Sequence, residues 1–295
     1  MKIIYVLGSG RSGSTVLERV MATAADTVGV GEFHCFWRRP AHELLCSCGQ
    51  TFSRCEFWTE VVRASRISEA DLVRLRTLED SVVRNKFLLQ QRFSLARLTS
   101  NPQVKEFLGY QDVLLDAVCA VSGKTTIIDS SKAGPRGWIM ALDDRVSFVH
   151  VTRQAQDVFP SWMLPKWDRV REAPMKQMSL VHAAFDWWRV EQSAAMLRKQ
   201  VAIRHIDYAQ FAHSPEEALL AARITGPNGL LGEIPWLDGS SVESPTDYHS
   251  LNGNPDRYDR GPIQIAFRTP RLEKLGRLDR IGVRLLGGLL DKLYP

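Results

Sequence analysis

The stretch that decides the fold is an apolar run, a glycine-rich turn and an amphipathic segment in direct succession: Lys2-Ile3-Ile4-Tyr5-Val6-Leu7, Gly8-Ser9-Gly10-Arg11-Ser12-Gly13-Ser14-Thr15 and Val16-Leu17-Glu18-Arg19-Val20-Met21. The apolar run predicts a buried β-strand, and the amphipathic segment predicts a helix that begins at the turn. Such a turn presents unpaired backbone N–H groups and the positive end of the helix dipole to its occupant. The sequence therefore predicts a binding site for phosphate or sulfate.

The turn departs from a nucleotide P-loop at one position. Gly8 and Gly13 have the P-loop spacing, but Ser14 stands where that motif has its phosphate-binding lysine. Arg11 is the one cation in the turn. We therefore expect an anion-binding loop that does not work in the way of an ordinary ATPase.

Composition narrows the class of ligand. The 295 residues are 44% hydrophobic and 24% charged, with a net charge of +5, which suits an anionic ligand. No segment concentrates Lys and Arg into a stripe, so we expect no nucleic-acid partner. No apolar run approaches the roughly 18 residues of a membrane span, and no signal peptide is visible. We expect a soluble, cytoplasmic protein, whose oligomeric state the sequence leaves open.

Further strand-like runs alternate with helical patterns along the chain, at residues 27–30, 125–128, 146–151 and 201–206. This alternation predicts an α/β fold with a P-loop-type parallel sheet flanked by helices. We expect a single domain over residues 1–295, with a helical insertion at about 54–123 that forms a lid or acceptor region. Residues 226–262 predict a long functional loop, and residues 271–293 return to a helical pattern.

Ligands of parallel sheets bind at the carboxyl ends of the strands, and two more polar groups are expected there. Asp129-Ser130-Ser131-Lys132 directly follows the third predicted strand, and Arg153 follows the fourth, with Ser161 eight residues later. An arginine at a strand end is commonly a salt-bridge partner, but it can also bind phosphate through two parallel hydrogen bonds. Together with the opening turn, Arg153 and Ser161 predict a ligand with phosphate-like groups at both ends.

These segments resemble a known family. The turn of residues 8–15 resembles the 5′-phosphosulfate loop of sulfotransferases that use 3′-phosphoadenosine 5′-phosphosulfate (PAPS), and residues 151–162 resemble their 3′-phosphate motif. Four further segments resemble bacterial members, in the family's order: Val30-Gly31-Glu32-Phe33, Cys46-Ser47-Cys48-Gly49 to Cys55-Glu56-Phe57-Trp58, Asp129-Ser130-Ser131-Lys132 and Gly253-Asn254-Pro255-Asp256-Arg257. Residues 60–123 carry no resemblance, and Gln154 stands where an acidic residue is usual.

The resemblance implies a metal-free, in-line transfer of a sulfuryl group from PAPS to a hydroxyl of a small-molecule or carbohydrate acceptor. It implies that the 5′-phosphosulfate is held by the residues of the turn: Gly10, Arg11, Ser12, Gly13, Ser14 and Thr15. Arg153 and Ser161 would hold the 3′-phosphate, with Arg257 a weaker candidate for the same group. The sequence does not identify the acceptor molecule.

An attacking hydroxyl must lose its proton, so the reaction needs a general base. The resemblance implies Glu32, just past the second predicted strand. His34 is the competing base, since its intrinsic pKa suits the task, although its side chain would point the other way if the strand continued. Lys132 and Arg11 would stabilise the bridging oxygen of the donor. Lys132 could otherwise form a salt bridge with Asp129.

The five cysteines do not predict a disulfide framework, because their number is odd. Zinc at Cys46, Cys48 and Cys55 would need a fourth ligand from Cys35, His34 or His42, and the Cys-x-Cys spacing is atypical of structural zinc sites. We therefore expect no metal, and a reduced or locally bridged cysteine loop.

Four of the tryptophans, and the apolar residues near them, allow two interpretations. Trp162, Trp167, Trp187 and Trp188 could line an apolar acceptor pocket, but Val181, Phe185 and Trp188 at helical spacing favour a core face.

Two other functions compete with the sulfotransferase interpretation. One is a P-loop kinase or NTPase, which the missing lysine disfavours. The other is a non-catalytic nucleotide-binding module, which Glu32 and Lys132 disfavour.

Overall fold

The computed structural model describes residues 1–38, 44–168, 172–269 and 271–294. The strands are β1 (Lys2–Leu7), β2 (Thr27–Gly31), β3 (Thr126–Lys132), β4 (Val146–Thr152), β5 (Trp167–Asp168), β6 (Ala173–Pro174), β7 (Ile203–Asp207), β8 (Ser241–Val242) and β9 (Ile263–Gln264). The α-helices are α1 (Ser14–Met21), α2 (Cys35–Arg38), α3 (Glu56–Ser65), α4 (Glu69–Val82), α5 (Asn85–Gln90), α6 (Leu95–Ser100), α7 (Pro102–Ser122), α8 (Gly134–Met140), α9 (Ala155–Met163), α10 (Leu180–Leu197), α11 (Tyr208–His213), α12 (Pro215–Ala221), α13 (Arg277–Gly282) and α14 (Gly288–Leu293). Shorter helical turns are η2 (Phe52–Arg54), η3 (Pro255–Tyr258), η4 (Leu272–Lys274) and the π-helical η5 (Val283–Gly287).

A five-stranded parallel sheet forms the centre of the fold, in the order β2-β3-β1-β4-β7. Side chains of the central strand β1 alternate between two cores, as the pleat of a strand requires. Ile3, Tyr5 and Leu7 pack into one core, and Ile4 and Val6 pack into the other. The prediction of an α/β fold with a parallel sheet flanked by helices is confirmed.

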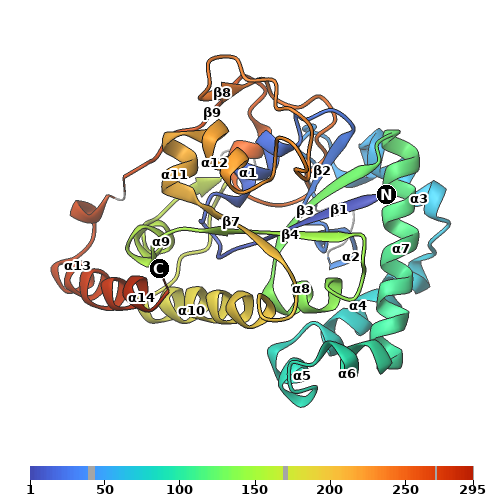
Figure 1. Cartoon of the computed structure of the whole chain (residues 1–295), viewed down its shortest axis with the longest axis horizontal. Helices are drawn as coiled ribbons and strands as arrows, with labels where there is room; N and C mark the ends of the chain where they lie inside the picture. The colour runs from blue at the N-terminus through green and yellow to red at the C-terminus, as the bar shows by residue number, and fades with distance from the viewer. Residues whose placement is uncertain (39–43, 169–171, 270, 295) are drawn as a thin grey trace.

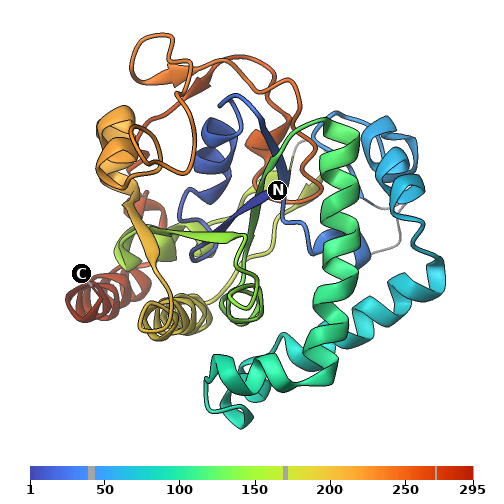
Figure 2. The ribbon, with the colours of Figure 1, turned by 45° about the vertical axis from the view of Figure 1, so that its right-hand side comes forward.

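Helices cover both faces of this sheet. Helices α1, α11 and α12 lie on one face, and α8 and α10 lie on the opposite face (Figure 1). The turned view in Figure 2 shows the same layers, with the long helix α7 standing beside the sheet. Helices α3, α4 and α6 pack against α7. The helices predicted at about 54–123 and 271–293 are therefore present, while the division of the chain into domains stays a prediction.

The third strand is longer than the sequence indicates. β3 continues through Asp129 to Lys132, so the polar segment forms the end of the strand and does not follow it. Its backbone stays paired with β1, where Leu7 lies opposite Lys132 after a register shift. Buried hydroxyls are tolerated because they have partners: Ser130 Oγ donates to Glu18, and Ser131 Oγ donates to Asp129.

The prediction of a core face on α10 is wrong for Val181, Phe185 and Trp188, whose exposed fractions are 71%, 57% and 39%. The helix instead buries Ala183, Ala184 and Trp187. Small alanine side chains let α10 lie close to its neighbours α8 and α9, and the larger residues are left on the outer face.

The segment of residues 226–262 is largely irregular, as predicted, and lies over the face of the sheet that carries α1 (Figure 1). Across the described part of the chain, we find no helix with both the length and the apolar character that a membrane crossing requires.

Candidate functional site

The turn after β1 has the geometry of an anion-binding loop. Gly13 precedes α1 with φ +93°, and a Cβ there would lie 2.1 Å from the ring of Tyr208, so only glycine fits. Helix α1 has neither a side-chain cap nor an acidic residue in its first turn. Because the first N–H groups of a helix have no partner within it, those of α1 are left for a ligand of the turn.

Two serine hydroxyls of the turn add to these donors. Ser9 and Ser12 are buried, with exposed fractions of 2% and 0%. Within the described ranges, neither hydroxyl has a hydrogen-bond partner. A buried polar group without a partner costs free energy, which makes these hydroxyls candidate contacts for a bound anion.

Arg11 is held over this turn by Trp162. The Arg11 guanidinium lies 4.7 Å from the centre of the Trp162 ring, and Trp162 Nε1 donates to the carbonyl of Gly10 at 3.1 Å. Arg11 Nη1 donates to Asn254 at 3.4 Å, while its buried Nε has no partner in the described part of the chain. Burial lowers the pKa of Arg11, and an anion bound beside it would raise the pKa again by stabilising the charged guanidinium.

Arg153 directly follows β4, two residues before α9 begins, and Ser161 lies within α9. The Arg153 guanidinium lies 5.0 Å from the Tyr208 ring and 5.2 Å from the Phe267 ring, and donates to the carbonyl of Arg268 at 3.0 Å. Arg153 Nε lies 3.9 Å from Asp157. Ser161 Oγ accepts a hydrogen bond of 2.8 Å from Lys166.

Lys166 connects the two anion sites that the sequence predicts. Partial burial and the charges of Arg11 and Arg153 lower the pKa of the Lys166 ammonium to about 8, and Arg268 contributes in the same direction. These four residues form what we call the cation cluster. Sequence reasoning missed Lys166 and Arg268, since neither lies in a quoted motif and only folding brings Lys166 near Arg11 and Arg268 near Arg153.

Glu32 and Lys132 form an ion pair at the ends of β2 and β3. Lys132 Nζ lies 2.6 Å from Glu32 Oε1, and Asn252 donates to Glu32 Oε2 at 2.9 Å. Burial alone would raise the pKa of Glu32, but the charges of Lys132 and His34 and these hydrogen bonds lower it to about 2. Asp129 is not the partner of Lys132; it accepts from Ser131 and lies 3.6 Å from Arg136.

His34 lies on the same side as Glu32. Strand β2 ends at Gly31 and the chain turns, with Cys35 N donating to the carbonyl of Glu32 at 2.9 Å, so the alternation of a strand does not apply. Polar atoms of Glu32 and His34 lie within 4.8 Å of each other. Burial lowers the pKa of His34. A cavity of about 150 Å³ beside His34 is also lined by Ala133 and Arg136.

Arg257 organises the loop that carries Asn254. Its guanidinium is buried and donates to the carbonyls of Gly253 and Asn254, at 2.7 and 3.3 Å. From α1, Arg19 donates to the carbonyls of Asp256 and Asp259, at 2.5 and 2.7 Å. Both arginines thus fasten this loop beside the turn. That Arg257 also binds a phosphate stays a prediction.

A carboxylate from α14, near the C-terminal end of the sequence, lies at the N-terminus of α9. Gln154, the residue before α9, forms no side-chain cap. Asp291 of α14 accepts hydrogen bonds from the backbone of Ala155 and Gln156, at 2.5 and 3.4 Å. A carboxylate at a helix N-terminus stabilises the helix dipole, so Asp291 supports the helix that carries Ser161.

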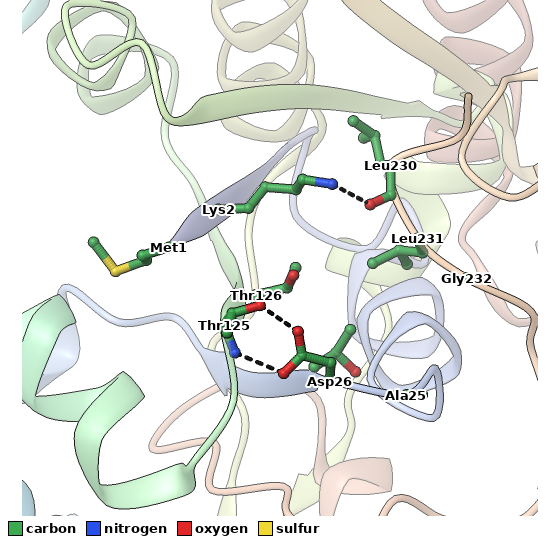
Figure 3. A pocket seen from close by; sticks show the side chains of 10 residues that line it. Met1, Lys2, Ala25, Asp26, Thr125, Thr126, Leu230, Leu231 and Gly232 are labelled. Atoms are coloured by element: carbon green, nitrogen blue, oxygen red, sulfur yellow. Dashed lines mark hydrogen bonds between the residues drawn. The ribbon is translucent and has the colours of Figure 1, made fainter.

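A hollow of about 430 Å³ lies at the amino end of the sheet, opposite the turn (Figure 3). Its two charged side chains already pair with protein groups: Lys2 donates to the carbonyl of Leu230 at 2.9 Å, and Asp26 accepts from Thr125 N at 2.9 Å. We therefore place the candidate site at the carboxyl edge.

The comparison with known proteins gives structural matches only. No protein-family model and no curated protein sequence matches this chain. Solved structures do: the sulfotransferase domain of the Synechococcus PCC 7002 olefin synthase has a TM-score of 0.47 at 17% identity, covering 96% of this chain and 93% of that one. The sulfotransferase domain of the curacin biosynthetic pathway has a TM-score of 0.43 at 12% identity and covers 96% of both chains. Sulfotransferase STF9 of Mycobacterium avium has a TM-score of 0.39 at 12% identity, covering 75% of this chain and 62% of that one.

All three are named as sulfotransferases. The sequence motifs of this chain resemble the same class of enzyme.

Proposed function

We propose that the chain is a sulfotransferase that moves the sulfuryl group of PAPS to a hydroxyl of a small-molecule or carbohydrate acceptor. The observation that carries the proposal is the arrangement of charge at the carboxyl edge of the sheet. The cation cluster and the N-terminus of α1 suit an elongated polyanion, and the Glu32–Lys132 pair offers a base beside a cation.

The donor would span the two anion sites. The 5′-phosphosulfate would lie in the turn, bound by the N–H groups of α1, Arg11, Ser12, Ser14 and Thr15. The 3′-phosphate would be bound by Arg153 and Ser161, and Lys166 would lie between the two charged ends of the donor. We assign the neutralisation of the donor to these side chains, and not to a metal ion.

The transfer would be an in-line displacement at sulfur. The acceptor oxygen forms a bond to sulfur while the bond from sulfur to the bridging phosphate oxygen breaks, and 3′-phosphoadenosine 5′-phosphate leaves. The proton of the acceptor hydroxyl passes to Glu32, and Lys132 and Arg11 stabilise the negative charge on the bridging oxygen. The cavity beside His34 is a place from which the acceptor hydroxyl would approach.

The low pKa of Glu32 sets a condition on this mechanism. A carboxylate with a pKa of about 2 is a weak base, and Lys132 is the first of the charges that lower it. When Lys132 turns to the donor, Glu32 loses that partner and its basicity rises. Donor binding would therefore precede the activation of the acceptor hydroxyl.

Binding of the donor nucleotide tests the proposal directly. We expect 3′-phosphoadenosine 5′-phosphate to raise the melting temperature of the protein, and ATP with Mg²⁺ to have a smaller effect. Arg153→Gln should abolish the shift, whereas Arg66→Gln, at an exposed site on the helical insertion, should preserve it. Stabilisation by ATP with Mg²⁺ alone would refute the proposal in favour of a kinase or NTPase.

Transfer is tested separately, by incubating the protein with PAPS and a panel of hydroxyl compounds. Formation of 3′-phosphoadenosine 5′-phosphate together with a sulfated product would support the proposal. Binding without transfer to any member of the panel would favour the non-catalytic nucleotide-binding module.

A further inference from the structure

Three cysteines and one histidine from two distant segments meet beside the active-site loops. The ligand atoms of Cys46, Cys48, Cys55 and His249 all lie within 4.8 Å of one another. His249 Nδ1 lies 3.6 Å from Cys46 Sγ and 3.5 Å from Cys55 Sγ. In a tetrahedral zinc site, with Zn–S near 2.3 Å and Zn–N near 2.0 Å, a sulfur and a nitrogen ligand lie about 3.5 Å apart.

The backbone around the cysteines forms a tight turn that directs two of the sulfurs to the same place. Gly49 N donates to the carbonyl of Cys46, and Cys46 N donates to the carbonyl of Gln50, both at 2.9 Å. Gly49 has φ +87°, a conformation that a side chain would strain. Leu45 and Thr51 pair across the turn as an antiparallel bridge, which fixes both sides of it.

The histidine segment is locked against the cysteine segment by its own contacts. Ser47 Oγ donates to the carbonyl of Tyr248 at 2.7 Å, and Trp58 Nε1 donates to the carbonyl of His249 at 3.0 Å. The Phe57 ring is stacked on the imidazole of His249, with 4.3 Å between the ring centres. The orientation of the imidazole toward the three sulfurs is therefore set before any ligand binds.

We propose that Cys46, Cys48, Cys55 and His249 bind one zinc ion in a closed, four-ligand structural site. The three thiols would lose their protons to the solvent on binding, and the imidazole would bind as the neutral form through Nδ1. A second group of ligand atoms, at Glu32, His34 and Cys35, is less suited to a metal because the Glu32 carboxylate is already paired with Lys132.

The proposal departs from our sequence-based expectation of no metal and of a reduced or locally bridged cysteine loop. Neither Cys35 nor His34 completes the set, and His42 lies outside the described residues. The fourth ligand is His249, which lies 194 residues after Cys55 in the sequence. No local spacing rule for zinc motifs finds a ligand at that distance.

The site would fasten the loop that supports Glu32. His249 lies three residues before Asn252, whose side chain donates to Glu32. Fixing residues 248–250 to the cysteine turn therefore limits the movement of Asn252. The zinc proposal can hold even if the proposed reaction is wrong, because the metal content is measured without donor or acceptor.

The test is the metal content of the full chain, purified without an affinity tag that binds metals and dialysed against metal-free buffer. We expect about one zinc per chain in the unaltered protein. Cys48→Ser and His249→Gln should lose most of it, and the matched controls Cys119→Ser and His213→Gln should retain it. Replacement of zinc by Co²⁺ should give the absorption bands of tetrahedral cobalt bound by thiolates, a readout that needs no variant.

Three outcomes would overturn the proposal. The first is a folded, reduced chain that takes up neither zinc nor Co²⁺. The second is zinc that all four variants retain equally, since the ion would then be bound elsewhere. The third is a disulfide among Cys46, Cys48 and Cys55, found by peptide mapping of the native protein under non-reducing conditions.

Discussion

At the scale of single residues, the two candidate bases Glu32 and His34 lie close together, and Glu32 is paired with Lys132. If Glu32 is the base, Glu32→Gln should lower kcat by roughly 10²- to 10⁴-fold. The binding of 3′-phosphoadenosine 5′-phosphate should change little, because the variant preserves the size of the side chain. Steady-state kinetics and calorimetry on the same preparation measure the two effects, with Glu233→Gln on the surface as the control.

The dependence of kcat/KM for the donor on pH separates the two bases, because this ratio reports the ionisation of the free enzyme. The pKa of Glu32 in the free protein is lowered to about 2, so with this base kcat/KM should stay level between pH 5 and 7. Burial also lowers the pKa of His34 from 6.5, so with His34 as the base kcat/KM should fall as the pH drops through that lowered pKa. A large loss of turnover in His34→Asn, together with full activity of Glu32→Gln, would transfer the role to His34.

We expect Lys166 to make donor binding depend on pH. Its pKa is lowered to about 8, so the ammonium is charged below this pH and loses its proton above it. We expect the Kd for 3′-phosphoadenosine 5′-phosphate to increase as the pH rises from 7 to 9. Lys166→Met should weaken binding at pH 7 by about 10- to 100-fold and make it less sensitive to pH.

The exposed Lys199→Met is the control for this effect, and isothermal calorimetry at several pH values is the measurement. An identical pH dependence of binding in the Lys166→Met variant and the unaltered protein would show that Lys166 does not contact the donor.

At the scale of elements, helix α1 is tied to β2 and β3 by one buried carboxyl group. Glu18 accepts hydrogen bonds of 2.5 Å from Gly31 N and from Ser130 Oγ. Burial raises the pKa of Glu18 from 4.5 to about 7, although both hydrogen bonds act in the opposite direction. The folded protein therefore holds a proton here that the unfolded chain releases above pH 4.5.

The stability that this proton contributes is fully present below pH 4.5 and is lost as the pH rises through 7. Glu18→Gln mimics the protonated carboxyl group and should remove this loss, so its free energy of unfolding should exceed that of the parent at pH 8 by up to about 3 kcal/mol. Urea denaturation at pH 5 and pH 8 measures the difference. The exposed Glu217→Gln should show none, and a Glu18→Gln variant less stable than the parent at pH 8 would contradict the prediction.

At the scale of the whole molecule, the end of the chain supports the start of the helix that carries Ser161. Asp291 of α14 accepts from the backbone at the N-terminus of α9. Asp291→Ala should destabilise the protein by about 1 kcal/mol, the usual effect of losing a cap, and should weaken donor binding indirectly. Thermal unfolding with and without the donor nucleotide measures both effects. The exposed Asp116→Ala, within α7, is the control.

The parts of the fold that depend on local patterns could be predicted from the sequence. The apolar run of residues 3–7 and the turn after it identified β1 and α1, because a buried strand and a glycine-rich turn depend on a few neighbouring residues. The end of β3 and the buried face of α10 were mispredicted. Both depend on tertiary partners, namely the acceptors of Ser130 and Ser131 and the neighbours of α10.

The candidate site follows the same rule. Glu32 and Arg153 stand directly after strands, and Arg11 lies in the turn that follows β1, so their common edge could be inferred from a parallel sheet. Lys166, Asn252 and Asp291 reach the site across loops or from the end of the chain, and their contacts with Ser161, Glu32 and α9 exist only in the folded protein.

The cation cluster also bears on how quickly a ligand arrives. We expect the four positive charges of Arg11, Arg153, Lys166 and Arg268 to produce a positive potential at this edge of the sheet, of which Asp256 offsets a part. Polyanions should therefore be drawn toward this edge during diffusion. The association rate of a nucleotide with several phosphate groups should therefore fall steeply as ionic strength rises. A neutral nucleoside gains nothing from this attraction, so discrimination against it begins at the first encounter.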